Sequence, residues 1–580
     1  MKQKITNLIA VAFMLLFALP VMAYEAEIDG IFYRFSGNNA IVTYETYGGE
    51  SYSGDIVIPS SVTYNGREYT VTQIGNEAFH GCANVTSVVI PESVTNIGEY
   101  AFRLCSSMTS VNIPEGIQVL NKWCFAECTS LESIVIPESV TEIGACVFYQ
   151  CRNLTSMNFP SGIVKVGASA FEDTPWFNEQ PDGLVYIGNV AYKYKGEIPS
   201  GTEITLREGT VCISGECFWE WQCTGLTSIT IPNTVTSIGF GAFYNCGRLT
   251  SITLPNSLVE IENTAFAHCS SLTSIVIPSS VKSLGGTMFS CCYALESIVV
   301  ESGNTVFDSR ENCNAIIRTS NNVMIEGCKS TTFPEGIAVI GRSALSNTRL
   351  TSAVLPNSLK SIGEYALQDC DSLTSIVIPD SVTFIDAYAF RMCSNLATVS
   401  LGRSVRSIYS EAFADMRCLT DMYCYADEVP YANSNVFKNS KVDENATLHV
   451  PYQLLEEYRT RFPWSSFKEI VPIIIGKCEA PTITLLPNGR VKVESATEGA
   501  TCVTNITATN AEPITDGEIS LTEALVVYTV TAYATAEAYE DSDVTTYSFT
   551  LERTENDING DGVLNVGDVT RLISLILGAE

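Results

Sequence analysis

Residues 272–278 read LTSIVIP, and the same seven letters return at residues 373–379. In both places an apolar pair is closed by proline, and this mark recurs along the chain at a fixed interval. Within three groups it recurs at steps of 23 residues: Pro91, Pro114, Pro137 and Pro160; Pro232, Pro255 and Pro278; Pro356 and Pro379. A period in the range of about 20–50 residues is typical of solenoids, in which each repeat forms one coil and neighbouring coils stack.

The repeat unit has its own apolar pattern. In LTSIVIPSSVKSLGGTMFSCCYA, Leu272, Ile275 and Ile277 follow the alternation of a half-buried strand. Most units also carry a phenylalanine, at Phe79, Phe102, Phe125, Phe148, Phe171, Phe218, Phe243, Phe266, Phe289, Phe390 and Phe413. One coil cannot bury these side chains, whereas stacked coils join them into a continuous core. The sequence therefore predicts a mainly β fold, a solenoid of 23-residue coils with a parallel sheet over residues 24–420.

The period is interrupted twice, at residues 160–206 and 300–333. In both stretches apolar and polar residues alternate about Gly or Asn turns, which is the pattern of a β-hairpin. We therefore expect two enlarged coils that bear hairpins.

The unit LTSIVIPxSVxxIGxxAFxxC resembles the BspA-type leucine-rich repeats of secreted and surface proteins in anaerobic bacteria. The resemblance covers residues 56–423, where the Pro, Ala-Phe and Cys positions recur together. It implies an extracellular scaffold for binding, often for adhesion, and no catalysis. The chain itself has three histidines and shows no HExxH, GxSxG or P-loop motif, so we predict that it is not an enzyme.

Nine of the 21 cysteines stand three residues after the Phe position. They are Cys82, Cys105, Cys128, Cys151, Cys246, Cys269, Cys292, Cys370 and Cys393. In-register side chains on stacked coils point parallel to one another, whereas a disulfide needs converging Cβ atoms. We therefore expect most of them to be buried thiols that act as compact apolar groups, although export would permit disulfides. Neither CxxC spacing nor a nearby histidine accompanies the other closely spaced cysteines, which disfavours a zinc site.

The chain opens with the features of a secretory signal peptide. Lys2 and Lys4 precede an almost wholly apolar run at residues 8–19, and Ala23 supplies the small residue at which cleavage is expected. The run is too short to span a bilayer, and no later run is long enough. The formal net charge of −31 repels phosphate backbones, which disfavours a nucleic-acid partner. We expect an exported protein that binds an extracellular protein or a cell-surface ligand.

Two further modules are predicted after the repeats. Residues 421–475 contain a short amphipathic helix with Leu454, Leu455 and Tyr458 on one face, and they are expected to cap the open end of the solenoid. Residues 476–553 alternate as short strands between Gly, Asn and Asp turns, which predicts a small immunoglobulin-like β-sandwich.

The final motif is DINGDGVLNVGD at residues 557–568, followed by an apolar helix pattern. Its oxygen-bearing positions and the glycine at loop position 6 follow the order that wraps Ca²⁺. The predicted ligands are Asp557, Asn559, Asp561, the carbonyl of Val563, and Asp568. Residues 554–580, a short helical calcium-binding module, resemble a dockerin repeat. This resemblance implies calcium binding and a cohesin-like partner, although dockerins carry two such repeats and one stands here.

Two surfaces are candidates for binding a partner. The first is the strand face, with the small, uncharged outward positions Thr230, Thr253 and Val276, where repetition along the coils would have to supply avidity. The second is the first enlarged coil, with the aromatic residues Trp176, Phe177, Tyr186, Tyr192 and Tyr194. The sequence predicts a secreted or cell-surface binding scaffold for adhesion or protein–protein interaction. The alternative is a structural spacer that its C-terminal module holds in an assembly.

Overall fold

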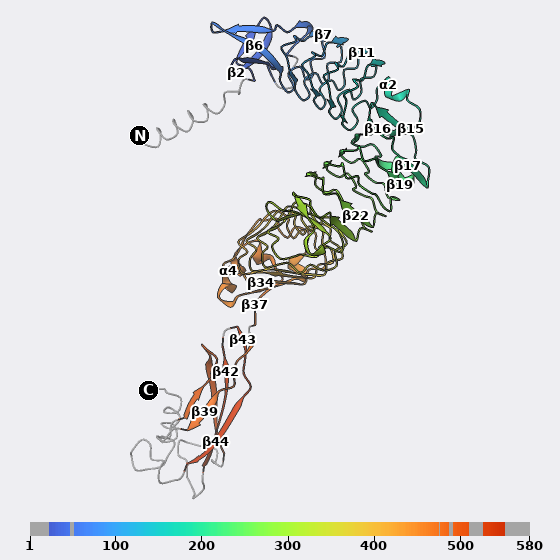
Figure 1. Ribbon diagram of the computed structural model, residues 1–580. Helices are drawn as coiled ribbons and strands as arrows, with labels where there is room; N and C mark the ends of the chain where they lie inside the picture. Colours follow the sequence, from blue (N-terminus) through green and yellow to red (C-terminus); the bar gives the residue numbers. More distant parts are fainter. Residues whose placement is uncertain are drawn as a thin grey trace, which may run out of the picture. The chain divides into compact units, whose positions relative to one another are not determined.

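The computed structural model describes residues 23–46, 51–474, 476–485, 491–509, 526–536 and 538–551 (Figure 1). The chain divides into two compact units. The first comprises Met1–Leu396, Ser407–Cys418 and Asn435–Ser440, and the second comprises Ala397–Arg406, Leu419–Ser434 and Lys441–Glu580. Among the described residues, no helix is long and apolar enough to cross a membrane. The predicted signal peptide lies outside the described residues, apart from Ala23.

Most regular coils of the first unit contribute parallel strands on two sides of the solenoid. On one side, the short strands β20 (Ser237–Ile238), β21 (Glu260–Ile261) and β23 (Ser283–Leu284) pair in that order. On another side, β22 (Ser274–Ile277), which lies within LTSIVIP, pairs with β24 (Ser297–Val300). The paired positions are one repeat apart, since Ile275 lies opposite Ile298. The solenoid of parallel coils that the period predicts is therefore confirmed.

The other coils of the first unit follow the same plan. In these coils, the strands on the side of β22 are β4 (Gly54–Val57), β7 (Val85–Val89), β9 (Ser110–Val111), β11 (Ser133–Ile134), β13 (Ser156–Met157), β17 (Thr202–Thr205), β19 (Leu226–Thr230) and β30 (Ser375–Ile378). Their short strands are β8 (Asn96–Ile97), β10 (Val119–Leu120), β12 (Glu142–Ile143), β14 (Lys165–Val166), β18 (Cys212–Ile213), β28 (Val339–Ile340), β29 (Ser361–Ile362), β31 (Phe384–Ile385) and β33 (Ser407–Ile408).

The phenylalanine positions form the core between these sheets. All eleven are buried, as predicted. Neighbouring rings stack in register: Phe102 lies 5.3 Å from Phe125 at 2°, and Phe243 lies 5.4 Å from Phe266 at 3°. Burial of each ring contributes about 1.5–3 kcal/mol, and aromatic pairing adds about 0.5–1.5 kcal/mol.

In several coils a hydroxyl group joins the coil to the one before it. The serine two residues after the repeat proline donates to a backbone carbonyl of the preceding coil, for example Ser257 to Val235 at 2.6 Å and Ser280 to Leu258 at 2.7 Å. These carbonyls would otherwise lack a partner at the turn, and leaving a buried acceptor unpaired costs about 1–3 kcal/mol. The serine in the repeat therefore has a structural role.

The N-terminal part of the first unit is antiparallel, which the sequence did not predict. Strands β1 (Ala26–Ile28), β2 (Ile31–Ser36) and β3 (Asn39–Val42) form a meander, and β3 then pairs in parallel with β6 (Arg67–Ile74). Strand β5 (Ser61–Tyr64) forms a hairpin with β6. Tyr33, Val42 and Ile74 are fully buried where the meander meets the first coils. A solenoid end needs such a cover, since its first coil has no neighbour to bury it.

Both enlarged coils bear hairpins, as predicted. In the first, α2 (Pro175–Asn178) precedes the antiparallel strands β15 (Gly183–Ile187) and β16 (Val190–Lys195). In the second, β25 (Phe307–Asp308), β26 (Ala315–Arg318) and β27 (Val323–Gly327) form an antiparallel sheet.

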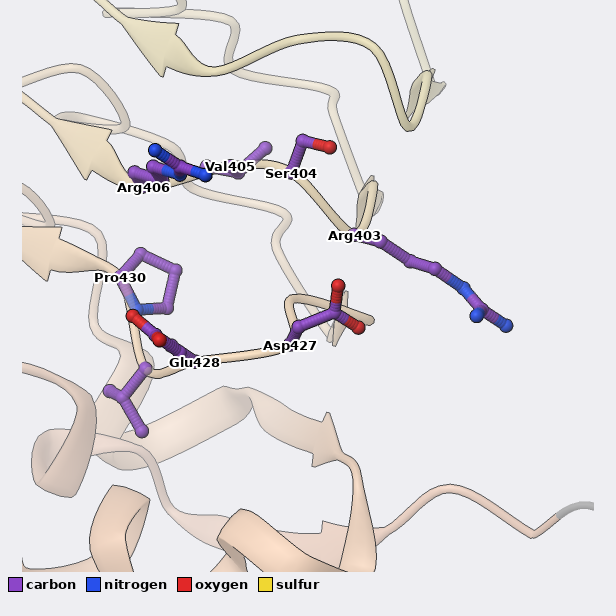
Figure 2. A pocket seen from close by; sticks show the side chains of 8 residues that line it. Arg403, Ser404, Val405, Arg406, Asp427, Glu428 and Pro430 are labelled. Carbon is purple, nitrogen blue, oxygen red and sulfur yellow. The ribbon is translucent and has the colours of Figure 1, made fainter.

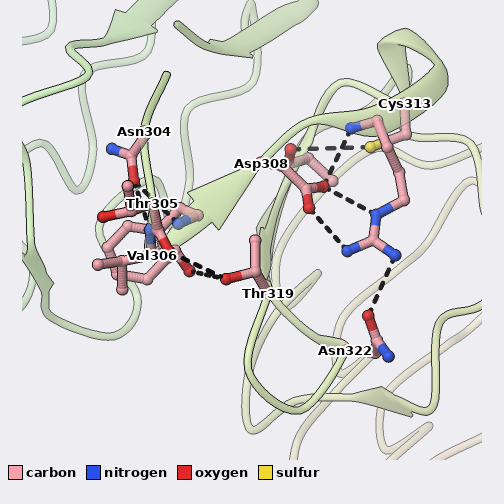
Figure 3. A network of polar contacts seen from close by, with 10 residues as sticks. Asn304, Thr305, Val306, Asp308, Cys313, Thr319 and Asn322 are labelled. Carbon is pink, nitrogen blue, oxygen red and sulfur yellow. Dashed lines mark hydrogen bonds and ion pairs between the residues drawn. The ribbon is translucent and has the colours of Figure 1, made fainter. Parts of the chain in front are cut away.

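Polar contacts fix the second hairpin (Figure 3). The guanidinium of Arg310 donates to both carboxylate oxygens of Asp308, at 2.9 and 2.7 Å, and to the amide oxygen of Asn322 at 3.1 Å. The hydroxyl of Thr319 donates to the carbonyl of Val306 at 3.1 Å. The turns of this coil are thereby tied to its own strands.

The second unit contains a parallel sheet that extends beyond the predicted end of the repeats. Strands β32 (Thr398–Leu401), β34 (Asp421–Cys424), β36 (Thr447–Val450) and β37 (Glu469–Pro472) pair in parallel. The boundary placed at Asp421 therefore lies inside this sheet, because coil geometry survives after the sequence period fades. Helix α4 (Leu455–Thr460) buries Leu455 and Tyr458, as its amphipathic pattern predicts.

Beyond residue 475 the described part of the second unit consists mostly of antiparallel strands, with one short parallel pair between β38 (Gly476–Lys477) and β43 (Tyr539–Glu540). Strands β41 (Thr501–Thr509), β42 (Val526–Thr535) and β44 (Thr545–Leu551) form one sheet, and β39 (Thr482–Leu485) pairs with β40 (Val491–Glu494). Val530, Ala532 and Ala534 of β42 are buried, so one face of the sheet is covered. The strands agree with the predicted β module, and the sandwich arrangement stays a prediction.

Candidate partner-binding surfaces

The outward positions of the strand face are exposed, as the alternation predicts. Val135 is 74% exposed and Val354 is 85% exposed. Thr230, Thr253 and Val276 are exposed as well. The face is therefore a strip of small, uncharged side chains that solvent reaches.

Asparagine replaces these residues in two coils and ties the coils together. The Asn112 side chain accepts the N–H of Ile90 at 2.7 Å and donates to its carbonyl at 2.8 Å. Asn158 makes the same pair of bonds to Ile136, both at 2.8 Å. Each amide thus takes the place of a backbone ladder contact, so these two positions are structural.

Thr230, Thr253 and Val276 line one groove of about 680 Å³. Its other lining residues come from the same coils and the next one: Ile229, Ile231, Asn233, Ile252, Leu254, Pro255, Asn256, Pro278 and Glu301. The three positions that the sequence placed on one face therefore meet in a single concave surface. Apart from Glu301, the lining is uncharged.

The groove coincides with a break in the sheet. Strand β19 pairs with β17 and β22 pairs with β24, while residues 251–254 between them form no strand. Within the described chain, no backbone hydrogen bond joins residues 251–254 to either neighbouring coil. The short strands of the same coils remain paired through β20, β21 and β23. The coils are thus held together on one side and leave backbone N–H and C=O groups unpaired on the other.

The aromatic residues of the first enlarged coil lie mostly in the core. Phe177 and Tyr192 are buried, and the Tyr192 hydroxyl accepts the N–H of Phe171 at 2.9 Å. Trp176 packs edge-on against Phe171, with ring centroids 5.3 Å apart. Phe177 and Tyr192 are therefore core residues and cannot reach a partner in the folded chain. Strand β16 is buried on both faces along much of its length, which alternation alone cannot indicate.

Tyr186 and Tyr194, the other two aromatic candidates, are half-buried. The Tyr186 hydroxyl accepts the N–H of Arg207 at 3.0 Å, and the Arg207 guanidinium lies 4.2 Å from the ring centroid. Tyr194 packs against Phe218 at 6.3 Å. The structure does not gather the five predicted aromatics into one exposed cluster.

A second hollow of about 450 Å³ lies in the second unit (Figure 2). Its charged lining comes from two neighbouring coils, Arg403 and Arg406 from one, and Asp427 and Glu428 from the next. It arises where the later coil is one residue longer: Val405 follows Leu401 by four positions, whereas Val429 follows Cys424 by five. Figure 2 shows Arg403 extending away from the hollow. The opposite charges balance, so this hollow selects no ligand by charge.

The cysteines of the repeat donate hydrogen bonds, which corrects their reading as purely apolar groups. The thiol of Cys128 donates to the carbonyl of Phe102 at 3.2 Å, and Cys151 to Phe125 at 3.1 Å. The same contact recurs at Cys105, Cys269, Cys292, Cys370 and Cys393. Desolvation raises the pKa of Cys151, Cys269 and Cys370 to about 12. These thiols are buried, as predicted, and are poor nucleophiles because the thiolate is disfavoured.

Cys246 departs from the prediction, since it forms a disulfide with Cys223. The Cα atoms are 4.8 Å apart, within the range that a disulfide spans. Cys223 is not at the repeat position. It lies in the short helix η1 (Glu220–Gly225), which brings its side chain toward the neighbouring coil. The argument from parallel, in-register side chains does not apply to such an off-register cysteine.

Among the described residues, no group of three His, Cys, Asp or Glu side chains is placed to hold a metal ion. The predicted calcium ligands at residues 557–568 lie outside the described residues. The buried carboxyl of Glu326 forms none of the ion pairs found among the described residues. It accepts the N–H of Met288 at 2.8 Å, and desolvation raises its pKa to about 8.

The model of the BspA type leucine rich repeat region matches residues 55–178, 185–316 and 324–443. No curated protein matches the chain.

Several solved structures resemble the chain. A leucine rich cell surface protein from Faecalibacterium prausnitzii is 23% identical, over 73% of this chain and 94% of that one, with a TM-score of 0.34. A leucine-rich repeat protein from Bacteroides ovatus is 22% identical, over 71% and 99%, with a TM-score of 0.26. The pneumococcal vaccine antigen PcpA is 18% identical, over 74% and 88%, with a TM-score of 0.35.

Proposed function

Because the chain belongs to the BspA-type leucine-rich repeat family, whose members are protein-binding or adhesion scaffolds, we propose that it is a secreted or cell-surface protein that binds an extracellular protein or cell-surface ligand. The proposal does not involve catalysis. Its support in the molecule is the groove where Thr230, Thr253 and Val276 meet, beside residues 251–254, whose backbone groups bond to neither neighbouring coil in the described chain.

The groove suits an extended segment of polypeptide. A bound peptide can offer N–H and C=O groups to an unpaired strand, which supplies affinity without specific side chains. The unpaired groups of residues 251–254 provide such partners, and Asn233 and Asn256 add side-chain donors and acceptors at the lining. Affinity at one groove is expected to be modest, since aromatic anchors are absent from this lining.

The test is the triple variant Thr230→Arg, Thr253→Arg and Val276→Arg, compared with the parent chain. The matched control carries Val57→Arg, Val135→Arg and Val354→Arg, which lie on exposed positions of the strand face outside the groove. Binding to immobilised extracellular-matrix extract and to bacterial surface extract is measured for all three proteins.

We expect the groove variant to lose binding and the control to retain it, with unchanged thermal unfolding in both. Equal binding by the groove variant and the parent would refute the groove as the docking site. If the parent itself binds neither extract, while chelation of calcium releases the chain from its native assembly, the spacer alternative is favoured.

The C-terminal module carries a separate proposal. Asp557, Asn559, Asp561, the carbonyl of Val563, and Asp568 would bind one Ca²⁺ ion. The support is their order in the sequence, with a glycine at the sharp turn of the loop. A cohesin-like partner would require this loop to be loaded with calcium.

A further inference from the structure

Three aromatic side chains stack on the turn side of two consecutive coils, away from the strand face. The Trp219 ring lies 6.1 Å from that of Phe240 at 23° and 4.2 Å from that of Tyr244 at 17°. Phe240 is 39% exposed, and Trp219 and Tyr244 are half-buried. His268 extends the group, with its ring 4.9 Å from Tyr244. We call Trp219, Phe240 and Tyr244 the aromatic platform.

A glycine makes room for the platform. Gly241 has a φ of 56°, in the left-handed region, and a Cβ atom added to it would overlap the indole of Trp219. The indole therefore lies directly against the backbone of the neighbouring coil. The equivalent turns in the next two coils carry threonine with the same backbone conformation, Thr264 at 55° and Thr287 at 53°. Replacement of threonine by glycine at this turn allows the ring to settle between Phe240 and Tyr244.

Stacked rings at other turns of the same solenoid hold an arginine of the chain itself. Arg103 lies 4.8 Å from the ring centroid of Trp123, which stacks on Tyr100, and its Nη2 atom lies 2.8 Å from a carboxylate oxygen of Glu127. Tyr365 and Tyr388 stack at 4.7 Å, and each receives a guanidinium. The partners are Arg342, which also pairs with Glu364, and Arg391, which also pairs with Asp415.

In each of these sites one guanidinium contacts both an aromatic ring and a carboxylate. Arginine also makes every cation–π contact recorded among the described residues. A guanidinium is planar and weakly hydrated, so it stacks on a ring while its edge donates to a carboxylate. In this chain, the cation that fits a pair of stacked rings beside a carboxylate is therefore the guanidinium of arginine.

The aromatic platform has the rings and the carboxylates but no such cation. None of the cation–π contacts in the described part of the chain involves Trp219, Phe240 or Tyr244. The carboxylate of Glu262 lies at the platform edge, where it accepts the N–H of Phe240 at 3.0 Å.

The carboxylates beside the platform also outnumber their cation. Lys165 is shared by Glu262, at 2.6 Å, and Glu260, at 3.0 Å, so this group keeps a net negative charge. The chain as a whole carries −31. A positive side chain is therefore attracted to this surface.

We propose that the aromatic platform binds an arginine side chain of a basic polypeptide, stacked on Phe240 and Trp219 with its edge toward Glu262. The inference goes beyond the groove and does not depend on it, since the two surfaces use different residues of the solenoid. A partner that carries arginine in an exposed basic segment would engage this site.

The test uses the full chain and three synthetic peptides with six Gly-Arg, Gly-Lys or Gly-citrulline repeats. Citrulline keeps the planar shape of the arginine head without its charge, and lysine keeps the charge without the plane. Affinity is measured by calorimetry at physiological salt for the parent, for Phe240→Ser and for Phe384→Ser. Phe384 is the matched control, because it is also 39% exposed and lies elsewhere on the solenoid.

We expect the arginine peptide to bind the parent most tightly, and Phe240→Ser to weaken that binding about tenfold. Phe384→Ser and the groove triple variant should bind like the parent. Equal affinity of Phe240→Ser and Phe384→Ser for the arginine peptide would overturn the proposal. The proposal would also be overturned if the parent bound the lysine peptide as tightly as the arginine peptide. A third contrary result would be that the parent binds a neutral hexasaccharide and that Phe240→Ser abolishes this binding but leaves binding of the arginine peptide unchanged.

Discussion

Replacement of Glu326 by glutamine should remove a pH dependence from the second enlarged coil. Glu326 is 2% exposed, and its carboxyl accepts a backbone N–H from the preceding coil. Desolvation raises its pKa from 4.5 to about 8. In the folded chain the carboxyl therefore keeps its proton up to about pH 8, whereas in the unfolded chain it loses the proton above about pH 4.5.

The sign and size of the effect follow from this difference. Unfolding releases a proton between these two values, so stability is full below pH 4.5 and falls as the pH rises through about 8. At about 1.4 kcal/mol per pH unit, the loss amounts to roughly 5 kcal/mol. The Gln side chain keeps an acceptor oxygen for the N–H of Met288 and has no proton to release. The stability of the Glu326→Gln variant should therefore not fall with pH in this range, even if the amide group lowers it by a constant amount.

Hydrogen exchange of peptides that contain residues 286–290 and 323–328 gives the local opening free energy at pH 5, 7 and 8.5, after correction for intrinsic exchange rates. The control is Glu311→Gln, an exposed carboxyl in the same enlarged coil. The parent and the control should lose stability together as the pH rises, and Glu326→Gln should stay level. If Glu326→Gln follows the same slope as the parent, the account of this carboxyl is wrong.

Three further predictions concern the cysteines and the calcium loop. Cys128→Ser should change the stability of the chain little, because Ser440 occupies the equivalent position of a later coil and donates to the carbonyl of Phe413 at 2.7 Å. Cys128→Val should destabilise the chain by about 1–3 kcal/mol in thermal unfolding, because the carbonyl of Phe102 loses its donor. Native thiol labelling should modify the exposed Cys418 first and spare the buried thiols, and rapid labelling of most cysteines would contradict their burial. Asp561→Ala in the intact chain should abolish tight uptake of one Ca²⁺ ion, and unchanged uptake would place the site elsewhere.

The parts of the fold that the sequence predicts are those that repeat. Each Phe position recurs in the same setting, so the ladder from Phe79 to Phe413 could be assigned from the period alone. The hairpins at β15–β16 and β26–β27 were also predictable, because turn residues separate alternating runs.

The parts that occur once were harder to predict. The antiparallel meander at residues 26–42 has no repeat to mark it, and the extra residue before Val429 shifts the period without ending the sheet. In the first enlarged coil, the alternation of apolar and polar residues did not predict which side chains are exposed. Strand β16 is covered on both faces, so Tyr192, which the sequence suggested as a surface residue, is buried in the core.

The aromatic platform was missed for a different reason. Trp219 and Tyr244 follow the Phe position of their coils, whereas Phe240 precedes the Ala-Phe pair of its own coil. No single column of the repeat contains all three, and the missing Cβ atom at Gly241 leaves the room in which Trp219 stacks on the other two rings. The one sign of the platform in the sequence was Gly241, because the equivalent turns of the next two coils carry threonine.

The central claim is that a partner docks in the groove beside the unpaired segment 251–254, and hydrogen exchange on the intact chain tests it most directly. In the free protein, the amides of residues 252–254 should exchange rapidly, while the alternate amides of β22 that face its partner β24 should be protected. When the chain is bound to the matrix or bacterial surface extract that retains it, residues 252–254 should become protected. Protection of these amides in the free chain, or no change in them upon binding, would contradict the account.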